Sequence, residues 1–169
     1  CTILDTMCGI GYGSYMMGVT GIPSKIVAFD IDHDTIEYAK RWYQCPNIEF
    51  RCHSYEDMDV EYKTFDLITC YEAIEHITKP LLLLTGLCLA MKDDGVLLLS
   101  TPNGAVLPHD PVKFPEHVLH YTAPQLEEKL NTCGFKVEKW LTQHNKNDMF
   151  MRNDLDGKFM IAVCRKDIG

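Results

Sequence analysis

The sequence lacks any cluster of basic residues. It carries 16 Lys and Arg against 24 Asp and Glu, a formal net charge of −8 over 169 residues, and its basic runs do not extend beyond pairs such as Lys40-Arg41. Proteins that bind a nucleic-acid backbone need a cationic surface that displaces counterions from the phosphates. We therefore expect no nucleic-acid partner.

Long apolar runs, repeats and linkers are absent as well. No segment approaches the ~20 apolar residues that a membrane-spanning helix needs, so we expect no membrane partner. The composition, with 46% hydrophobic and 24% charged residues, is that of a globular protein. We expect residues 1–169 to form a single domain. Because the sequence begins with Cys1 inside a predicted strand, we also expect an N-terminal segment to be missing.

No pair among the eight cysteines has the CxxC spacing. They are scattered along the chain at Cys1, Cys8, Cys45, Cys52, Cys70, Cys88, Cys133 and Cys164. Several lie inside apolar runs, which is typical of small buried side chains in a reducing compartment. We therefore expect a cytoplasmic protein.

What the sequence does contain is an alternation of short apolar runs and amphipathic stretches. The runs predict strands at residues 2–4, 25–29, 48–52, 65–70, 96–99, 135–141 and 158–164. A helix is expected over residues 12–19, after a glycine-rich turn. Strand and helix in alternation, with a strand pair at the end, predict an α/β sheet with helices on both faces.

Three further helices are indicated by caps and apolar stripes. Asp34 and Glu37 have the spacing of a capping box, and Ile36, Ala39 and Tyr43 share the following face. Leu84, Leu87, Cys88 and Met91 form the stripe of the next helix, which we expect to end at the Asp94-Gly95 turn. The last is predicted from the capping box Thr122 and Gln125, the stripe Leu126 and Leu130, and the stop at Gly134.

The glycine-rich turn is the first feature that points to a ligand. It contains Gly9, Gly11 and Gly13, and glycines at such a turn let the backbone approach a ligand closely. The second predicted strand leads to Asp30, about where an acidic residue binds ribose hydroxyls in nucleoside-binding folds. Together these residues predict a site for a nucleoside-containing ligand.

Five motifs resemble, in their order, those of class I S-adenosylmethionine-dependent methyltransferases. They are Ile3-Leu4-Asp5-Thr6-Met7-Cys8-Gly9-Ile10-Gly11-Tyr12-Gly13, Phe29-Asp30-Ile31-Asp32, Phe65-Asp66-Leu67-Ile68, Tyr71-Glu72-Ala73-Ile74-Glu75-His76 and Leu97-Leu98-Leu99-Ser100-Thr101-Pro102-Asn103. The resemblance implies a Rossmann-like, seven-stranded, mostly parallel sheet whose last strand is antiparallel. It also implies S-adenosyl-L-methionine as cofactor, converted to S-adenosyl-L-homocysteine, over the carboxyl ends of the first strands.

The resemblance also implies which residues bind that cofactor. Asp5 and the backbone of Gly9 and Gly11 surround the methionine part, and Glu72 lies beside the methionine end. Asp30 holds both ribose hydroxyls. The adenine is contacted by Ile31, Ser54 and Tyr55. As alternatives, Asp30 is a solvated strand-end carboxylate, and Ile31 and Tyr55 are packing residues.

Position 7 departs from the family pattern, because Met7 stands where the family usually has Gly. Its side chain either crowds the cofactor or points into the core.

Methyl transfer to an alcohol needs a base, and histidine suits that role near neutral pH. A long segment after the fifth predicted strand contains three histidines and resembles the Thr-Pro-Asn … His-x-x-x-Phe/Tyr-Thr stretch of ubiquinone-type and sugar-associated O-methyltransferases. We predict His117 as the base, with His76 second and His120 third; the alternative is that His117 anchors the loop. A metal site of His109, His117 and His120 with Asp110 or Glu116 is disfavoured by irregular spacing, so we expect no metal.

The sequence thus predicts a methyltransferase that acts on a hydroxyl of a small polar or sugar/glycan-type acceptor. An amine or a quinone-like phenol is the alternative acceptor. A protein of another class, a non-catalytic cofactor-binding module of the same fold, stays open as well.

Overall fold

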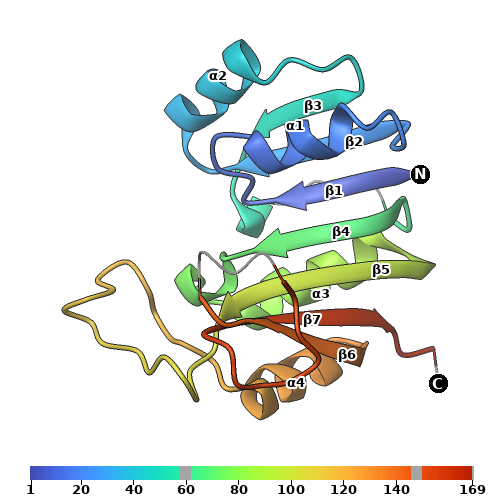
Figure 1. The fold of residues 1–169 in the computed structure, drawn as a ribbon. Coiled ribbons are helices and arrows are strands. Elements are labelled where there is room, and N and C mark those ends of the chain that lie inside the picture. The colour runs from blue at the N-terminus through green and yellow to red at the C-terminus, as the bar shows by residue number, and fades with distance from the viewer. Residues whose placement is uncertain (58–61, 146–149, 169) are drawn as a thin grey trace.

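The computed structural model describes residues 1–57, 62–145 and 150–168, in which seven strands form one sheet (Figure 1). The strands are β1 (Thr2–Thr6), β2 (Lys25–Asp30), β3 (Ile48–Cys52), β4 (Phe65–Tyr71), β5 (Met91–Pro102), β6 (Phe135–Gln143) and β7 (Phe159–Lys166). Their order across the sheet is β3-β2-β1-β4-β5-β7-β6. The first five strands in that order are parallel, and β7 pairs antiparallel with β5 and β6. This confirms the predicted sheet and its antiparallel last strand.

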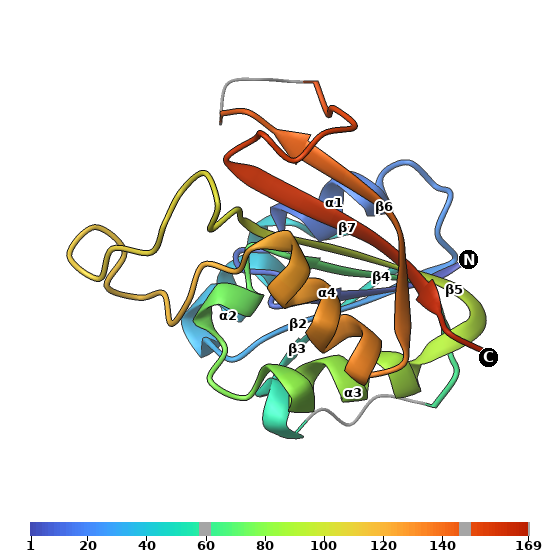
Figure 2. The same ribbon diagram turned by 90° about the horizontal axis from the view of Figure 1, so that it is seen from below.

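Helices cover both faces, as predicted. They are α1 (Tyr12–Gly18), α2 (His33–Trp42), α3 (Pro80–Ala90) and α4 (Ala123–Thr132), with short 3-10 turns η1 (Tyr55–Asp57) and η2 (Ile74–His76). Figure 2 shows α3 and α4 together on one face, with α1 on the other. Buried side chains of α3 and α4, among them Leu84, Leu87 and Leu126, join Ile68 and Leu97 of the sheet in one core. Burying such side chains is the main stabilising term of this layered fold.

Of the two capping boxes predicted from the sequence, the structure confirms one and contradicts the other. The capping box of α4 is present, since the Thr122 N–H donates to Gln125 Oε1 at 2.9 Å. The predicted box at Asp34 is wrong. Asp32 caps α2 by accepting the Thr35 N–H at 2.7 Å, and Asp34 lies in the first turn. Asp32 takes this role because its backbone is still extended, which aims its carboxylate at the free N–H groups of the helix.

The predicted turn at Asp94-Gly95 is also wrong. The helix α3 ends at Ala90, and β5 already begins at Met91, which pairs with Phe65 of β4. A register irregularity between Phe65 and Leu67 accommodates the early pairing. Met91 is buried as expected, but as a strand residue.

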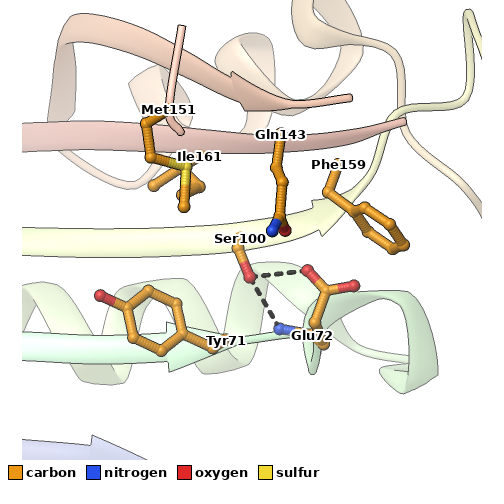
Figure 3. Close-up of a pocket in the computed structure, with 7 residues that line it drawn as sticks. All are labelled: Tyr71, Glu72, Ser100, Gln143, Met151, Phe159 and Ile161. Carbon is orange, nitrogen blue, oxygen red and sulfur yellow. Dashed lines mark hydrogen bonds between the residues drawn. The ribbon is translucent and has the colours of Figure 1, made fainter. Parts of the chain in front are cut away.

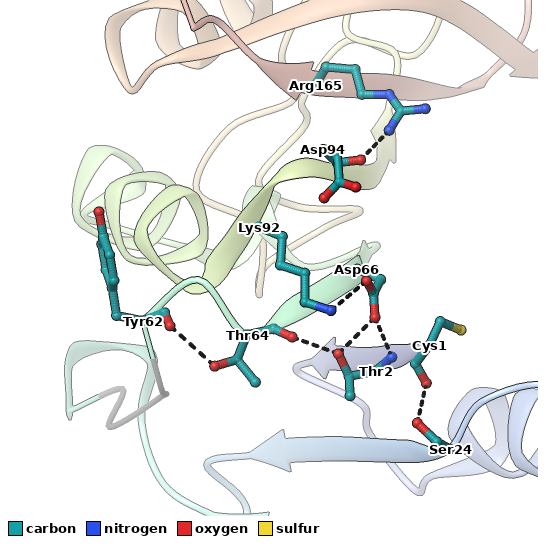
Figure 4. Close-up of polar contacts among 9 residues, drawn as sticks. All are labelled: Cys1, Thr2, Ser24, Tyr62, Thr64, Asp66, Lys92, Asp94 and Arg165. Atoms are coloured by element: carbon teal, nitrogen blue, oxygen red, sulfur yellow. Dashed lines mark hydrogen bonds and ion pairs between the residues drawn. The ribbon is translucent and has the colours of Figure 1, made fainter.

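At the amino ends of the strands, a polar cluster around Asp66 joins β1, β4 and β5 (Figure 4). Asp66 accepts the Thr2 N–H at 2.7 Å, the Thr2 hydroxyl at 3.0 Å and the Lys92 ammonium at 2.6 Å. These donors, Lys92 first, lower the pKa of Asp66 to about 2. A carboxyl group with a lowered pKa stabilises the fold above its unfolded pKa and loses that contribution as the pH falls.

We therefore expect Asp66→Asn to lower the free energy of unfolding at pH 7 by about 1 kcal/mol, after allowance for solvent screening of a pair that is about a third exposed. Urea unfolding measures the change. The difference from the wild type should shrink as the pH falls from about 4 to about 2. Asp156→Asn, at an exposed position, is the matched control and should leave stability unchanged. A difference that persists at pH 2 would contradict the electrostatic explanation.

Two further findings concern the cell context. No helix in the described residues has the length and apolar character that crossing a membrane requires. All eight cysteines are free thiols, and Cys70 and Cys164 are buried in the core.

Candidate cofactor and active site

A cavity of about 450 Å³ opens at the carboxyl ends of the parallel strands. In Figure 1 the arrowheads of these strands point toward the edge from which the loop of residues 103–122 projects. The lining residues come from the ends of β1, β2 and β3 and from the segment after β4: Met7, Phe29, Asp30, Ile31, His53, Tyr55, Glu72, Ala73, His76 and Ile77. The volume lies within the roughly 300–1,000 Å³ of small-molecule pockets. Six predicted site residues therefore meet in one cavity.

The glycine-rich turn closes one side of this region. The Gly9 N–H donates to Asp30 Oδ2 at 2.9 Å, which links the turn to the end of β2. Gly11 has φ +80°, and a Cβ there would lie 2.7 Å from the Phe50 ring, so only glycine fits. Gly9 and Gly11 do not line the cavity themselves; they shape the backbone beside it.

Met7 has the left-handed φ of 51° that explains why related turns use glycine at this position. Its side chain lines the cavity and also packs partly buried against the core. Met7 therefore packs against the core and also borders the space that we assign to the cofactor.

Asp5 lies in the protein interior and not in the cavity wall. Its carboxylate accepts the Ser14 hydroxyl at 2.5 Å and the Thr69 hydroxyl at 2.7 Å. Burial raises its pKa. In this structure Asp5 joins β1 to α1 and β4, and its carboxylate is already engaged by both hydroxyls.

His53 is a cavity residue that the sequence analysis did not single out. It stacks on Phe29 with ring centroids 4.3 Å apart. Its Nδ1 lies 3.1 Å from the Ser54 carbonyl, which only accepts, so the neutral ring carries its proton there. Nε2 is then a buried acceptor that has no hydrogen-bond partner among the described residues. The sequence signal that could have identified His53 was its position directly after β3, at the same carboxyl edge of the sheet where β2 ends with Asp30.

An unpartnered acceptor in the cavity wall is an independent test of whether the residues fit an adenosyl cofactor. Nε2 of His53 lacks a hydrogen-bond donor as partner, and the exocyclic amino group of adenine is such a donor. Asp30 accepts backbone N–H groups at both oxygens, from Gly9 and Asp32, and each oxygen keeps a second lone pair for a ribose hydroxyl. The donor and acceptor set fits S-adenosylmethionine. Ser54 lies outside the cavity wall, where its hydroxyl accepts the Glu56 N–H at 3.1 Å.

A second cavity, of about 480 Å³, meets the first at Glu72 (Figure 3). It is lined by Tyr71, Glu72, Ser100, Gln143, Met151, Phe159 and Ile161. The Ser100 hydroxyl donates to Glu72 Oε1 at 2.6 Å and accepts the Glu72 N–H at 3.1 Å. Glu72 has φ 46°, and partial desolvation raises the pKa of its carboxyl group. Two cavities that share one carboxylate provide adjacent places for two reactants.

The three predicted catalytic histidines lie together beside the first cavity. The Val118 N–H donates to the Glu75 carbonyl at 2.6 Å, which pins the long loop to η2. The His76 and His117 rings are consequently in edge contact, with centroids 4.6 Å apart. His117 Nδ1 lies 2.7 Å from His120 Nε2. His120 is buried and has both ring nitrogens engaged, so it positions His117.

Two groups in this cluster have shifted pKa values. Burial raises the pKa of Glu75 to about 7, and the nearby Glu72 carboxylate raises it further. Burial, together with the neighbouring histidines, lowers the pKa of His117. The His117 imidazole is therefore neutral near pH 7 and available to accept a proton.

Comparison with known proteins agrees with the fit of the first cavity to S-adenosylmethionine. A family model described as "Methyltransferase domain" matches residues 1–161. A Mycolicibacterium smegmatis protein, named "Probable S-adenosylmethionine-dependent methyltransferase", is 26% identical over 141 residues, covering 82% of this chain and 53% of that protein. A ubiquinone biosynthesis O-methyltransferase of Xanthomonas campestris is 31% identical over 104 residues, covering 60% of this chain and 43% of the relative. The chain spans about half the length of the curated relatives it matches.

Solved structures show the same fold. An S-adenosylmethionine-dependent methyltransferase of Mesorhizobium loti superposes with a TM-score of 0.79 at 14% identity, covering 98% of this chain and 90% of that chain. At that identity the likeness concerns the fold, and the reaction has to be argued from the site.

Proposed function

Because the chain belongs to the class I S-adenosylmethionine-dependent methyltransferases, we propose that it transfers a methyl group from that cofactor to a hydroxyl of a small acceptor. The observation that carries this proposal is the junction of two cavities at Glu72, with the rings of His76 and His117 in edge contact beside it. The first cavity, which contains Asp30 and His53, suits the cofactor. The second cavity, which contains Ser100 and Gln143, suits the acceptor. The free thiols support a reducing, cytoplasmic compartment for the reaction.

The chain's own residues would bind and orient the reactants. Asp30 accepts the ribose hydroxyls, His53 accepts the adenine amino group, and Glu72 lies between the two cavities. The cofactor supplies the methyl group as the acceptor oxygen's electron pair forms the O–C bond and the S–C pair returns to sulfur. His117 receives the hydroxyl proton at Nε2, while its Nδ1–H donates to His120 Nε2.

Two acceptor types fit the second cavity, each on its own observation. Glu72, Ser100 and Gln143 offer polar groups beside the Tyr71 ring, which suits a sugar or glycan hydroxyl. The remaining side chains, Met151, Phe159 and Ile161, are apolar and suit the body of a quinone-like phenol, the acceptor class suggested by the ubiquinone-type relatives. The sugar-type acceptor remains the first choice from the sequence.

Methyl-labelled S-adenosylmethionine with a panel of sugars, glycans, phenols and amines tests the proposal. We expect label in a hydroxyl-bearing acceptor, together with S-adenosylhomocysteine. Label in amines alone would overturn the hydroxyl assignment. Cofactor binding without transfer to any acceptor would instead favour a non-catalytic module.

A further inference from the structure

The long loop of residues 103–122 carries the proposed proton acceptor and projects from the body of the fold (Figure 2). Its two ends are joined at a narrow neck. The Gly104 N–H donates to the Tyr121 carbonyl at 2.8 Å, and a Cβ on Gly104 would overlap the His120 carbonyl, so only glycine allows this approach. The loop is therefore closed at its base, directly after β5.

Asn103 is the buried residue at which this neck joins β5. It is 1% exposed, and its Oδ1 accepts the Ala105 N–H at 3.1 Å. Its carbonyl accepts the Leu107 N–H at 2.7 Å. These hydrogen bonds fix the orientation of Asn103, because any other orientation would leave buried polar groups without partners. Asn103 thus sets the path of the first residues of the loop.

The Asn103 carboxamide also holds the segment that leads into β7. Its Nδ2 donates to the Leu155 carbonyl at 2.9 Å and to the Gly157 carbonyl at 3.0 Å. Phe159, two residues further on, lines the second cavity, which we assign to the acceptor. Asparagine suits this position because one carboxamide supplies two N–H donors and an acceptor, whereas an ionised aspartate only accepts.

A chain of hydrogen bonds leads from Asn103 to the proton acceptor. The Asn103 carbonyl accepts the Leu107 N–H, and the Leu107 carbonyl accepts the Nδ1–H of His120 at 2.7 Å. His120 Nε2 lies 2.7 Å from His117 Nδ1 and accepts its proton. The direction of this chain is fixed, because a carbonyl only accepts. The lone pair of His117 is consequently on Nε2, the atom that receives the proton in the proposed reaction.

We propose that Asn103 is a positioning residue, which holds the proton acceptor of the long loop at a fixed place relative to the acceptor cavity. The inference rests on the proposed function, in which His117 receives the hydroxyl proton. Asn103 fixes the start of the loop through Oδ1 and the residues before Phe159 through Nδ2. It lines neither cavity, so it acts through these neighbours. Displacing a reacting group by about 1 Å costs about 10²-fold in rate.

Nuclear magnetic resonance of the histidine side chains tests the positioning without any transfer reaction. In the wild type we expect His117 to carry its proton on Nδ1 and to have a pKa below its ordinary value, because of burial and the neighbouring histidines. In Asn103→Ala we expect both tautomers and a pKa closer to the ordinary value, since a loosened loop exposes the ring to water. The titratable groups around this ring are Glu75 and His76 of η2 and His109, Glu116 and His120 of the loop.

Asn47→Ala is the matched control. The Asn47 Nδ2 also donates to two carbonyls, those of Gly18 at 3.3 Å and Pro23 at 2.9 Å, but it lies directly before β3, at the amino edge of the sheet. The tautomer and the pKa of His117 should not change in this variant.

A second variant guards against a failure of Asn103→Ala to fold, which circular dichroism detects. Gly104→Ala disturbs the same neck from its other side, at the His120 carbonyl, and should change His117 in the same way. An unchanged tautomer and pKa of His117 in a folded variant of either position would overturn the positioning role.

Methyl transfer measures the consequence for the reaction. Asn103→Ala should lower kcat by about 10–100-fold and leave S-adenosylhomocysteine affinity unchanged. His120→Ala interrupts the same chain, so the double variant should lose little more than the weaker of the two single variants. Full additivity of the two losses would overturn the link through His120. Absence of transfer to every hydroxyl acceptor, with His117 behaving as expected in the resonance experiment, would overturn the proposed function alone.

Discussion

Replacing His117 with alanine is expected to reduce methyl transfer by about 10²–10⁴-fold, the contribution typical of a positioned proton acceptor. The loss follows because His117 receives the proton of the acceptor hydroxyl in the proposed reaction. S-adenosylhomocysteine affinity should not change, since His117 does not line the cofactor cavity. Labelled-methyl transfer and calorimetry on the same preparation measure the two quantities.

His33→Ala is the matched control for this experiment, because His33 is exposed at the start of α2 and should tolerate the same change. Turnover that stays at the wild-type level in His117→Ala would remove His117 from the reaction.

Asp30→Ala should weaken S-adenosylhomocysteine binding by about 100-fold, measured by calorimetry. Hydrogen bonds to a charged group contribute about 1.5–3 kcal/mol each, and about 2.7 kcal/mol corresponds to that factor. The substitution also removes the acceptor that holds the Gly9 N–H, which loosens the turn beside the cavity. Asp34→Ala, an exposed carboxylate on α2, is the control and should bind normally.

A graded response would support the assigned contacts. His53→Ala removes a single neutral acceptor and should weaken binding by only about 3–10-fold, in line with about 1 kcal/mol per neutral hydrogen bond. Equal affinity in Asp30→Ala and the wild type would show that the ligand site lies elsewhere.

Local sequence pattern located nearly every element and misjudged two of their ends. The strand at 48–52 and the Thr122 capping box were predicted correctly, because both depend on neighbours within a few residues. The errors at Asp34 and at Asp94-Gly95 occur where tertiary contacts decided. Met91 is recruited into β5 by pairing with Phe65 on β4, and Asp32 rather than Asp34 reaches the first free N–H groups of α2.

The sequence by itself determined the sheet, the family and the cofactor class, because alternating periodicity and the ordered motifs around Asp5, Asp30 and Glu72 are local signals. Only the tertiary structure decided which side chains meet. His117 reaches His76 across a loop that the N–H groups of Val118 and Leu119 anchor to the Glu75 carbonyl. His53 became a cavity residue through stacking on Phe29 of a neighbouring strand. Contacts between residues distant in the chain depend on strand register and loop closure, which no local pattern encodes.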